Sequence, residues 1–326
     1  MAAGARKAMA MVRNEALWPE LPLAAWQESR DTLHLWTQIV GKICLATRPW
    51  LNHSWHLALH VTARGLNTPL VSFAGRDLQI EFDFIDHLLW LRLGDGASRR
   101  IALEPMPVAA FYAAVFTALR EFGVDLQIDT MPNEIADAIP FERDETHRSY
   151  DPDFANRFWR ILLRAHDVFS YFRTAFLGKA SPVHFFWGSF DLAVTRFSGR
   201  HAPLHPGGIP HLSDAVVREA YSHEVSSAGF WPGGGAIAYP AFYSYAYPAA
   251  DGFPASPVRP AEAFFSRELG EFVLPYDAVR NAPDPEAALL HFLTSTYEAA
   301  AETAKWDRPS LECALGKIGQ PRAVFR

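Results

Sequence analysis

Cysteine is scarce in this chain, which has only Cys44 and Cys313 among its 326 residues. Two cysteines exclude a disulfide framework and a metal knuckle built from cysteine pairs, and they favour a reducing compartment. We therefore expect a soluble, cytoplasmic protein that is stabilised by its hydrophobic core.

Long apolar runs and basic runs are also absent. The longest nearly unbroken apolar run, Val108 to Leu119, falls well short of the roughly 20 residues that cross a bilayer. The N-terminal segment has no apolar stretch of signal-peptide length. The formal net charge is −6, and no cluster of Lys and Arg offers the phosphate contacts that nucleic-acid binding needs. Neither a membrane nor a nucleic acid is an expected partner.

The standard catalytic motifs are missing as well. The chain contains no dinucleotide-binding GxGxxG, no Walker loop and no GxSxG elbow. His223-Glu224 begins like the zinc-binding HExxH motif, but Ser227 stands where the second histidine is required. Function must therefore be inferred from composition and from side-chain patterns.

The composition indicates a globular protein with a high content of aromatic residues. Hydrophobic residues make up 49% of the chain and charged residues 20%, an ordinary balance for a folded core. Aromatic residues reach 13% and occur in segments that also carry His, Pro and Gly. Such segments suit the walls of a binding pocket, and plain core packing is the alternative interpretation.

Hydrophobic periodicity predicts an α+β fold of mostly antiparallel sheet with flanking helices. Residues 78–84 alternate between apolar and polar side chains, which is typical of a half-buried strand. The predicted helices span residues 24–46, 107–123, 151–177, 213–221 and 285–304. The other predicted strands span residues 53–64, 89–93, 100–103, 124–129, 182–197, 224–231, 241–247 and 272–274.

These elements occur twice in the same order, which suggests an internal duplication. Leu59–Thr62 (LHVT) resembles Leu192–Thr195 (LAVT), 133 positions further along. We expect two pseudo-repeated halves that form one compact unit around a central cleft. The expected parts are a flexible tail at 1–16, a first α+β half at 17–150 and a second half at 151–326 that carries the site.

Each half has one strand with a polar face. In the second half, Ser189, Asp191, Ala193 and Thr195 share a face, and in the first half the equivalent face includes His56 and His60. Polar faces in so hydrophobic a chain must meet water, a ligand or each other. A cleft between the halves satisfies these requirements.

Histidine clusters suggest a metal site. Neutral imidazole together with carboxylate is the ligand set that proteins use for zinc or iron. The alternative is a structural role for each histidine. The predicted metal ligands are His56, His60, His201 and His205.

Acid–base chemistry is the other possibility for this cleft. Asp191 lies among apolar neighbours, so its carboxylate must be paired or must have a raised pKa. An ion pair with Arg196 or Arg200 is the structural alternative. The catalytic candidates are His184, Asp191, His223 and Glu224. The ligand-binding candidates, for which core packing is the alternative, are Trp187, Arg196, Arg200, Phe230 and Trp231.

Several long strings carry a family resemblance. These are WPELPLAAWQESRDTLHLWTQIVGKI near the start, SPVHFFWGSFDLAVTRFSGR (181–200), HPGGIP (205–210) and EAYSHEVSSAGFWPGGG (219–235). With them the chain, from Trp18 to about Trp306, resembles a bacterial family catalogued as a domain of unknown function. The resemblance implies no activity, cofactor or catalytic residue.

The sequence thus predicts an enzyme that acts on a small organic molecule in a cleft lined by His, Asp and aromatic residues. The reaction is either metal-assisted, with zinc or iron, or metal-free acid–base catalysis. The alternative is a non-catalytic protein that binds a small molecule.

Overall fold

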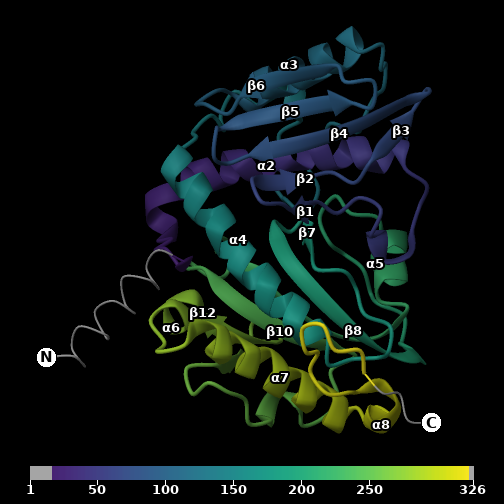
Figure 1. The fold of residues 1–326 in the computed structure, drawn as a ribbon, viewed down its shortest axis with the longest axis vertical. Helices are drawn as coiled ribbons and strands as arrows, with labels where there is room; N and C mark the ends of the chain where they lie inside the picture. Colours follow the sequence, from purple (N-terminus) through teal and green to yellow (C-terminus); the bar gives the residue numbers. More distant parts are fainter. Residues whose placement is uncertain (1–16, 323–326) are drawn as a thin grey trace, which may run out of the picture.

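The computed structural model describes residues 17–322, which form seven α-helices and two antiparallel sheets of six strands each (Figure 1). This confirms the predicted α+β class with mostly antiparallel sheet. The predicted tail at 1–16 lies outside the described residues.

The first sheet is a meander with helices α2 (Leu23–Thr47) and α3 (Val108–Glu121) packed beside it. Its strand order is β1-β2-β4-β5-β6, and β3 pairs with β4. In β4, Leu78, Ile80 and Phe82 are buried and alternate with partly exposed polar residues, as predicted. The strands are β1 (His60–Val61), β2 (Gly65–Asn67), β3 (Val71–Phe73), β4 (Arg76–Asp83), β5 (Leu88–Leu93) and β6 (Ser98–Ala102).

The second sheet contains the longer strands and has the order β11-β12-β10-β9-β8-β7. Its strands are β7 (His184–Phe186), β8 (Asp191–His201), β9 (His223–Trp231), β10 (Ala241–Tyr247), β11 (Phe264–Ser266) and β12 (Glu271–Pro275). The remaining helices are α4 (Pro152–Arg173), α5 (Asp214–Ala220), α6 (Tyr276–Arg280), α7 (Pro285–Thr303) and α8 (Arg308–Leu311). Single 3₁₀ turns lie at η1 (Asn52–Ser54), η2 (Phe141–Arg143) and η3 (Phe253–Ala255).

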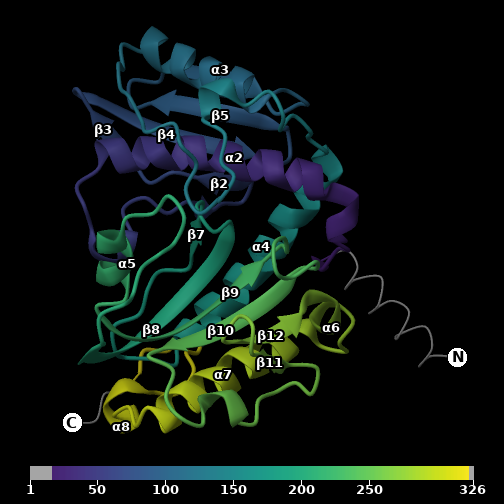
Figure 2. The same cartoon turned by 180° about the vertical axis from the view of Figure 1, so that it is seen from behind.

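The two faces of the second sheet differ in what they contact. Helices α4 and α7 pack on one face, so in Figure 1 they lie in front of the strands and in Figure 2 behind them. Leu192, Val194 and Phe230 are buried in the core on that face. Because side chains alternate along a strand, Asp191, Ala193 and Thr195 point the other way.

Three sequence predictions about strands are wrong. Residues 53–64 form η1, a turn and the two-residue strand β1, because the chain enters the left-handed region at His53 and Ser54. The pair His56 and His60 therefore shares no strand face. Residues 182–197 are a hairpin of β7 and β8, with Phe190 at φ 60° in the turn. Residues 124–129 contain no strand, and α4 ends at Arg173, short of the predicted 177.

The suggested duplication stays a prediction. In both halves a long helix precedes six antiparallel strands and another helix follows them, but β1 has two residues where β8 has eleven. The halves share one hydrophobic core. They also join at the backbone, where Leu59 N donates to Phe185 O at 2.9 Å and Phe185 N donates to Leu59 O at 2.8 Å.

Candidate functional site

A cavity of about 740 Å³ lies over the face of the second sheet that α4 and α7 leave free. Residues of β8, β9, β10 and β12 line one side of it, and the η1 turn, α5 and the loop at 129–134 line the others. The lining therefore combines residues from both halves of the chain. This volume is typical of cavities that hold small organic molecules.

Three carboxyl groups lie inside this cavity: Asp191 at the start of β8, Glu134 on the loop, and Glu271 at the start of β12. Asp191 is 6% exposed and accepts hydrogen bonds from Ser189 Oγ and from Tyr243 Oη. The side chains of Glu134 and Glu271 make no hydrogen bond or ion pair with any residue in 17–322. Both side chains are half-buried, and carboxyl groups that are removed from bulk water usually have such partners.

Burial changes the protonation of all three groups. It raises the pKa of Asp191, and the hydrogen bonds from Ser189 and Tyr243 oppose that change. Burial, followed by the charge of Asp191, raises the pKa of Glu134 and that of Glu271 to about 7. Two carboxyl groups of this cavity therefore change charge near neutral pH.

The buried polar face of α2 holds the loop that carries Glu134. Lys42 Nζ donates to Met131 O at 2.6 Å, and the Gln38 side chain bonds both the N–H (2.8 Å) and the carbonyl (3.0 Å) of Asn133. Glu134 then takes a left-handed φ of 62°, and its N–H donates to Pro210 O at 2.9 Å.

Two glycines make room for the carboxyl groups. A Cβ at Gly188 would overlap the Glu134 carboxylate, so any other residue would force that side chain to move from its present position. A Cβ at Gly229 would overlap the hydroxyl of Tyr243, its cross-strand partner, which crosses β9 to reach Asp191. The arrangement thus depends on glycines in two strings that the sequence analysis singled out, WGSFD and SSAGFW.

Hydroxyl groups continue the polar surface along the sheet. Tyr221 Oη and Tyr245 Oη lie 2.9 Å apart, and Thr195 Oγ1 and Ser227 Oγ lie 2.8 Å apart. Burial raises the pKa of Tyr243 well above its ordinary value, so its hydroxyl keeps its proton and donates to Asp191. Aromatic side chains form much of the remaining wall: Trp50, Trp55, Phe186, Trp187, Phe197 and Trp231.

The comparisons with known proteins give a family and no activity. Residues 18–313 match the model of a family described as "Family of unknown function (DUF5996)". The chain belongs to this family. No curated protein and no solved structure matches the chain. Among residues 17–322, no helix combines the length and apolar character needed to cross a membrane.

Within this DUF5996 chain, the predicted site residues do not all meet. Asp191, Trp187 and Trp231 line the cavity. His184 does not; it is 1% exposed beside the rings of Trp55 and Phe186, and burial lowers its pKa to about 3. Phe230 is buried on the opposite face of the sheet.

The remaining charged candidates have other partners. Arg196 is 2% exposed, donates to Phe172 O, and lies 3.5 Å from the centre of the Phe172 ring. Arg200 pairs with Glu224 at 2.6 Å. The prediction that Asp191 pairs with Arg196 or Arg200 is therefore wrong. Arg196 projects from the other face of β8, and Arg200 forms its ion pair with Glu224.

The four predicted metal ligands are not brought together. The ring of His201 contacts that of His223 with ring centres 4.6 Å apart, whereas His205 stacks on Tyr221 at 4.7 Å. His56 accepts a hydrogen bond from Leu51 N at 3.2 Å, and His60 lies on β1. Within the described part of the chain, no group of three or more His, Cys, Asp or Glu residues is arranged to hold a metal ion.

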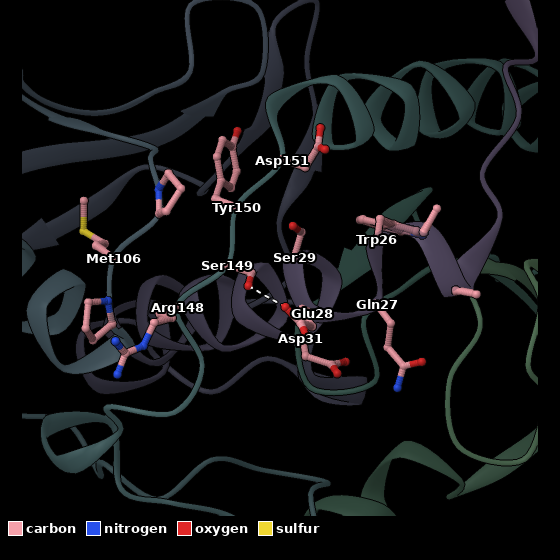
Figure 3. A pocket seen from close by; sticks show the side chains of 14 residues that line it. Trp26, Gln27, Glu28, Ser29, Asp31, Met106, Arg148, Ser149, Tyr150 and Asp151 are labelled. Carbon is pink, nitrogen blue, oxygen red and sulfur yellow. Dashed lines mark hydrogen bonds between the residues drawn. The ribbon is translucent and has the colours of Figure 1, made fainter.

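A second hollow, of about 860 Å³, lies at the N-terminal end of α2. Figure 3 shows its labelled side chains spread around an open space, with one dashed hydrogen bond, from Ser149 Oγ to Glu28 Oε2 at 2.9 Å. Of its charged groups, Glu28 and Arg148 are exposed to solvent, whereas Asp31 and Asp151 are half-buried and have partners in Arg30 and in the N–H of Phe154. The cavity over the second sheet is the stronger candidate, because Asp191 is buried in it and its two half-buried glutamates lack partners within 17–322.

Proposed function

We propose that this protein binds a small organic molecule in the cavity over the second sheet. The observation that carries the proposal is the pair of half-buried carboxyl groups, Glu134 and Glu271, that face a 740 Å³ space without a protein partner. Leaving buried polar groups unpaired is costly, and a ligand that pairs them offsets that cost. The unpaired cysteines Cys44 and Cys313 favour an intracellular setting.

A catalytic version of this function is supported by the protonation of the same groups. General acids and bases work best when their pKa lies near the working pH, and Glu134 and Glu271 have pKa values raised to about 7. In this version Asp191, Glu134 and Glu271 transfer protons, and Trp187 and Trp231 contact the substrate. His184, His223 and Glu224 are left out, since none of them lines the cavity.

The binding proposal is tested by blocking the cavity. Val216, on α5, lines it, whereas its neighbour Ala215 is exposed and does not. We expect ligands found by screening a metabolite library against the wild-type protein to lose binding to V216W and to keep it with A215W, as measured by ligand-observed NMR. Ligands that bind V216W as well as the wild type, or a library without any ligand, would refute the proposal.

Catalysis is tested by mass spectrometry of the same library after incubation with the protein. Consumption of a compound by the wild type, but not by D191N or E134Q, would support proton transfer in the cavity. Binding without consumption would leave the protein as a non-catalytic binder.

A further inference from the structure

We propose that the ligand of this cavity is a small organic ammonium ion, an amine whose protonated nitrogen binds between Asp191, Glu134 and Glu271. The inference rests on the proposed function and names the class of molecule that the cavity takes. Four independent features of the described residues support it: the charge of the lining, the unpaired carboxyl groups, the fixed position of Asp191, and the aromatic walls.

The charge of the lining has one sign. Four acidic side chains line the cavity, and among its lining residues within 17–322 none is Lys or Arg. One of the four, Asp129, is paired with Lys42 at 3.3 Å and is 74% exposed at the rim. Of the other three, Asp191 is buried and the two glutamates are half-buried, and none has a cationic partner within 17–322. Opposite charge is the direct way to stabilise buried carboxylates, so the missing charge is expected on the ligand.

The two glutamates lack hydrogen-bond donors. No donor within 17–322 reaches the carboxyl group of Glu134, which lies over the bare backbone of Gly188, and none reaches that of Glu271. A primary ammonium group carries three N–H donors and forms short, strong bonds to carboxylates. One nitrogen could therefore serve both glutamates and attract Asp191 as well.

Asp191 differs from the glutamates because its position is fixed. Both of its oxygens accept hydrogen bonds, from Ser189 and Tyr243, and these bonds favour the ionised form. Its charge, together with burial, keeps protons on Glu134 and Glu271 up to about pH 7. A bound cation would reverse that effect, so binding an amine at pH 7 should release protons from the glutamates.

The aromatic walls suit both ends of such a molecule. The rings of Trp187, Trp231, Tyr243 and Tyr245 line the same cavity as the carboxyl groups. Aromatic faces attract cations and also cover apolar skeletons. An anionic ligand would meet like charge, and a neutral polyol would leave the carboxylates uncompensated.

Other titratable groups also face this space. His53 and His211 line the cavity, together with Tyr221 and the rim residue Asp129. Lys179 lies behind His53, with its Nζ 2.6 Å from His53 Nε2. Burial, the Lys179 charge and the neighbouring His223 all lower the pKa of His53, although Ala220 O and Glu219 oppose them. A pH dependence must therefore be assigned to the glutamates by substitution.

The experiment compares matched molecules that differ only in charge. Sets of amine, alcohol and carboxylic acid on the same skeleton, such as 2-phenylethylamine, 2-phenylethanol and phenylacetate, are titrated calorimetrically between pH 6 and pH 8. We expect the amines to bind best, with affinity rising about tenfold over this range for each carboxyl group that binding ionises. Titrations at pH 7 in buffers of different ionisation enthalpy should show proton release.

Substitutions assign the effect to the cavity. E134Q and E271Q keep the side-chain shape and remove the charge, so each should weaken amine binding about tenfold or more and flatten its pH dependence. Alcohol binding should change little. E28Q, in the exposed hollow at α2, is the matched control and should leave amine binding unaltered.

The outcomes separate the two proposals. Alcohols, sugars or acids that bind in preference to their matched amines, and that are excluded by V216W, would overturn the ammonium inference and leave the proposed function standing. Amine binding that is insensitive to both E134Q and E271Q would also overturn it. Failure of every class to bind would overturn both.

Discussion

The double variant E134Q/E271Q is expected to be more stable than the wild-type protein at pH 8, and about equally stable at pH 4.5. Both glutamates have a pKa raised from the ordinary 4.5 to about 7 in the folded protein, chiefly by burial. The folded state therefore holds protons that the unfolded chain has already lost. The stability of the wild-type protein therefore falls as the pH rises from about 4.5 to about 7. The double variant does not lose stability in this way, because glutamine does not ionise.

The size of the effect follows from the raised pKa values. At 1.36 kcal/mol per pKa unit, each glutamate costs on the order of 3 kcal/mol once it is ionised in the folded protein. The other titratable groups are the same in the variant and the wild type. The pH dependence of the difference between their free energies of unfolding in urea therefore reports on these two glutamates alone. E262Q, at an exposed position, should give a difference that does not change with pH. A double variant with an equally flat difference would show that the glutamates are solvated.

Replacing Arg196 with Ala is expected to destabilise the protein by about 3 to 5 kcal/mol. Its guanidinium lies 3.5 Å from the ring centre of Phe172 and 4.3 Å from that of Tyr297, and it donates to Phe172 O near the end of α4. Truncation removes these cation–π contacts and one hydrogen bond to Phe172 O, and it opens a cavity in the core. R196M, which refills the space, should recover part of the loss.

A surface arginine provides the control for this prediction. Arg92 lies 4.8 Å from the Trp90 ring centre and pairs with Glu81 at 2.7 Å, but its side chain is 41% exposed. Solvent screening limits such contacts, so R92A should cost less than about 1 kcal/mol. Equal losses for R196A and R92A in urea unfolding would contradict the core role of Arg196. If R196A still binds the ligand of the cavity, that result would agree with the position of Arg196 on the opposite face of β8.

Elements with one buried face were predictable, whereas breaks inside apolar runs were not. The alternation in β4 follows from burial of a single face, so the periodicity predicted this strand. Helix α2 is buried on all sides from Thr32 to Cys44, and its apolar stripe predicted it because the other buried positions include polar residues such as Gln38 and Lys42. The run at 182–197 is apolar almost throughout, and this hides the hairpin turn made by Gly188, Ser189 and Phe190. A phenylalanine with φ at 60° carries no turn signal in sequence.

The candidate site was only partly visible in the sequence, for a related reason. Asp191 was noticeable as a charge within an apolar strand, while Glu134 lies in PNEIAD, which has the composition of an ordinary polar loop. Glu271 lies in LGEFV, where a charged residue after a glycine at the start of a short strand is ordinary as well. One signal was available in α2. His34, Gln38 and Lys42 recur every four residues along α2 and therefore share one face of the helix. Their partners are Gly188, Asn133 and Met131.

A crystal structure with the tightest-binding amine of the matched sets tests the central claim most directly. We predict electron density for the ligand over β8 and β10, with its nitrogen within hydrogen-bond distance of Glu134 or Glu271 and its skeleton against Trp187 or Trp231. Density for the amine in the exposed hollow beside Glu28, with the cavity unchanged, would contradict the assignment of these carboxyl groups to ligand binding.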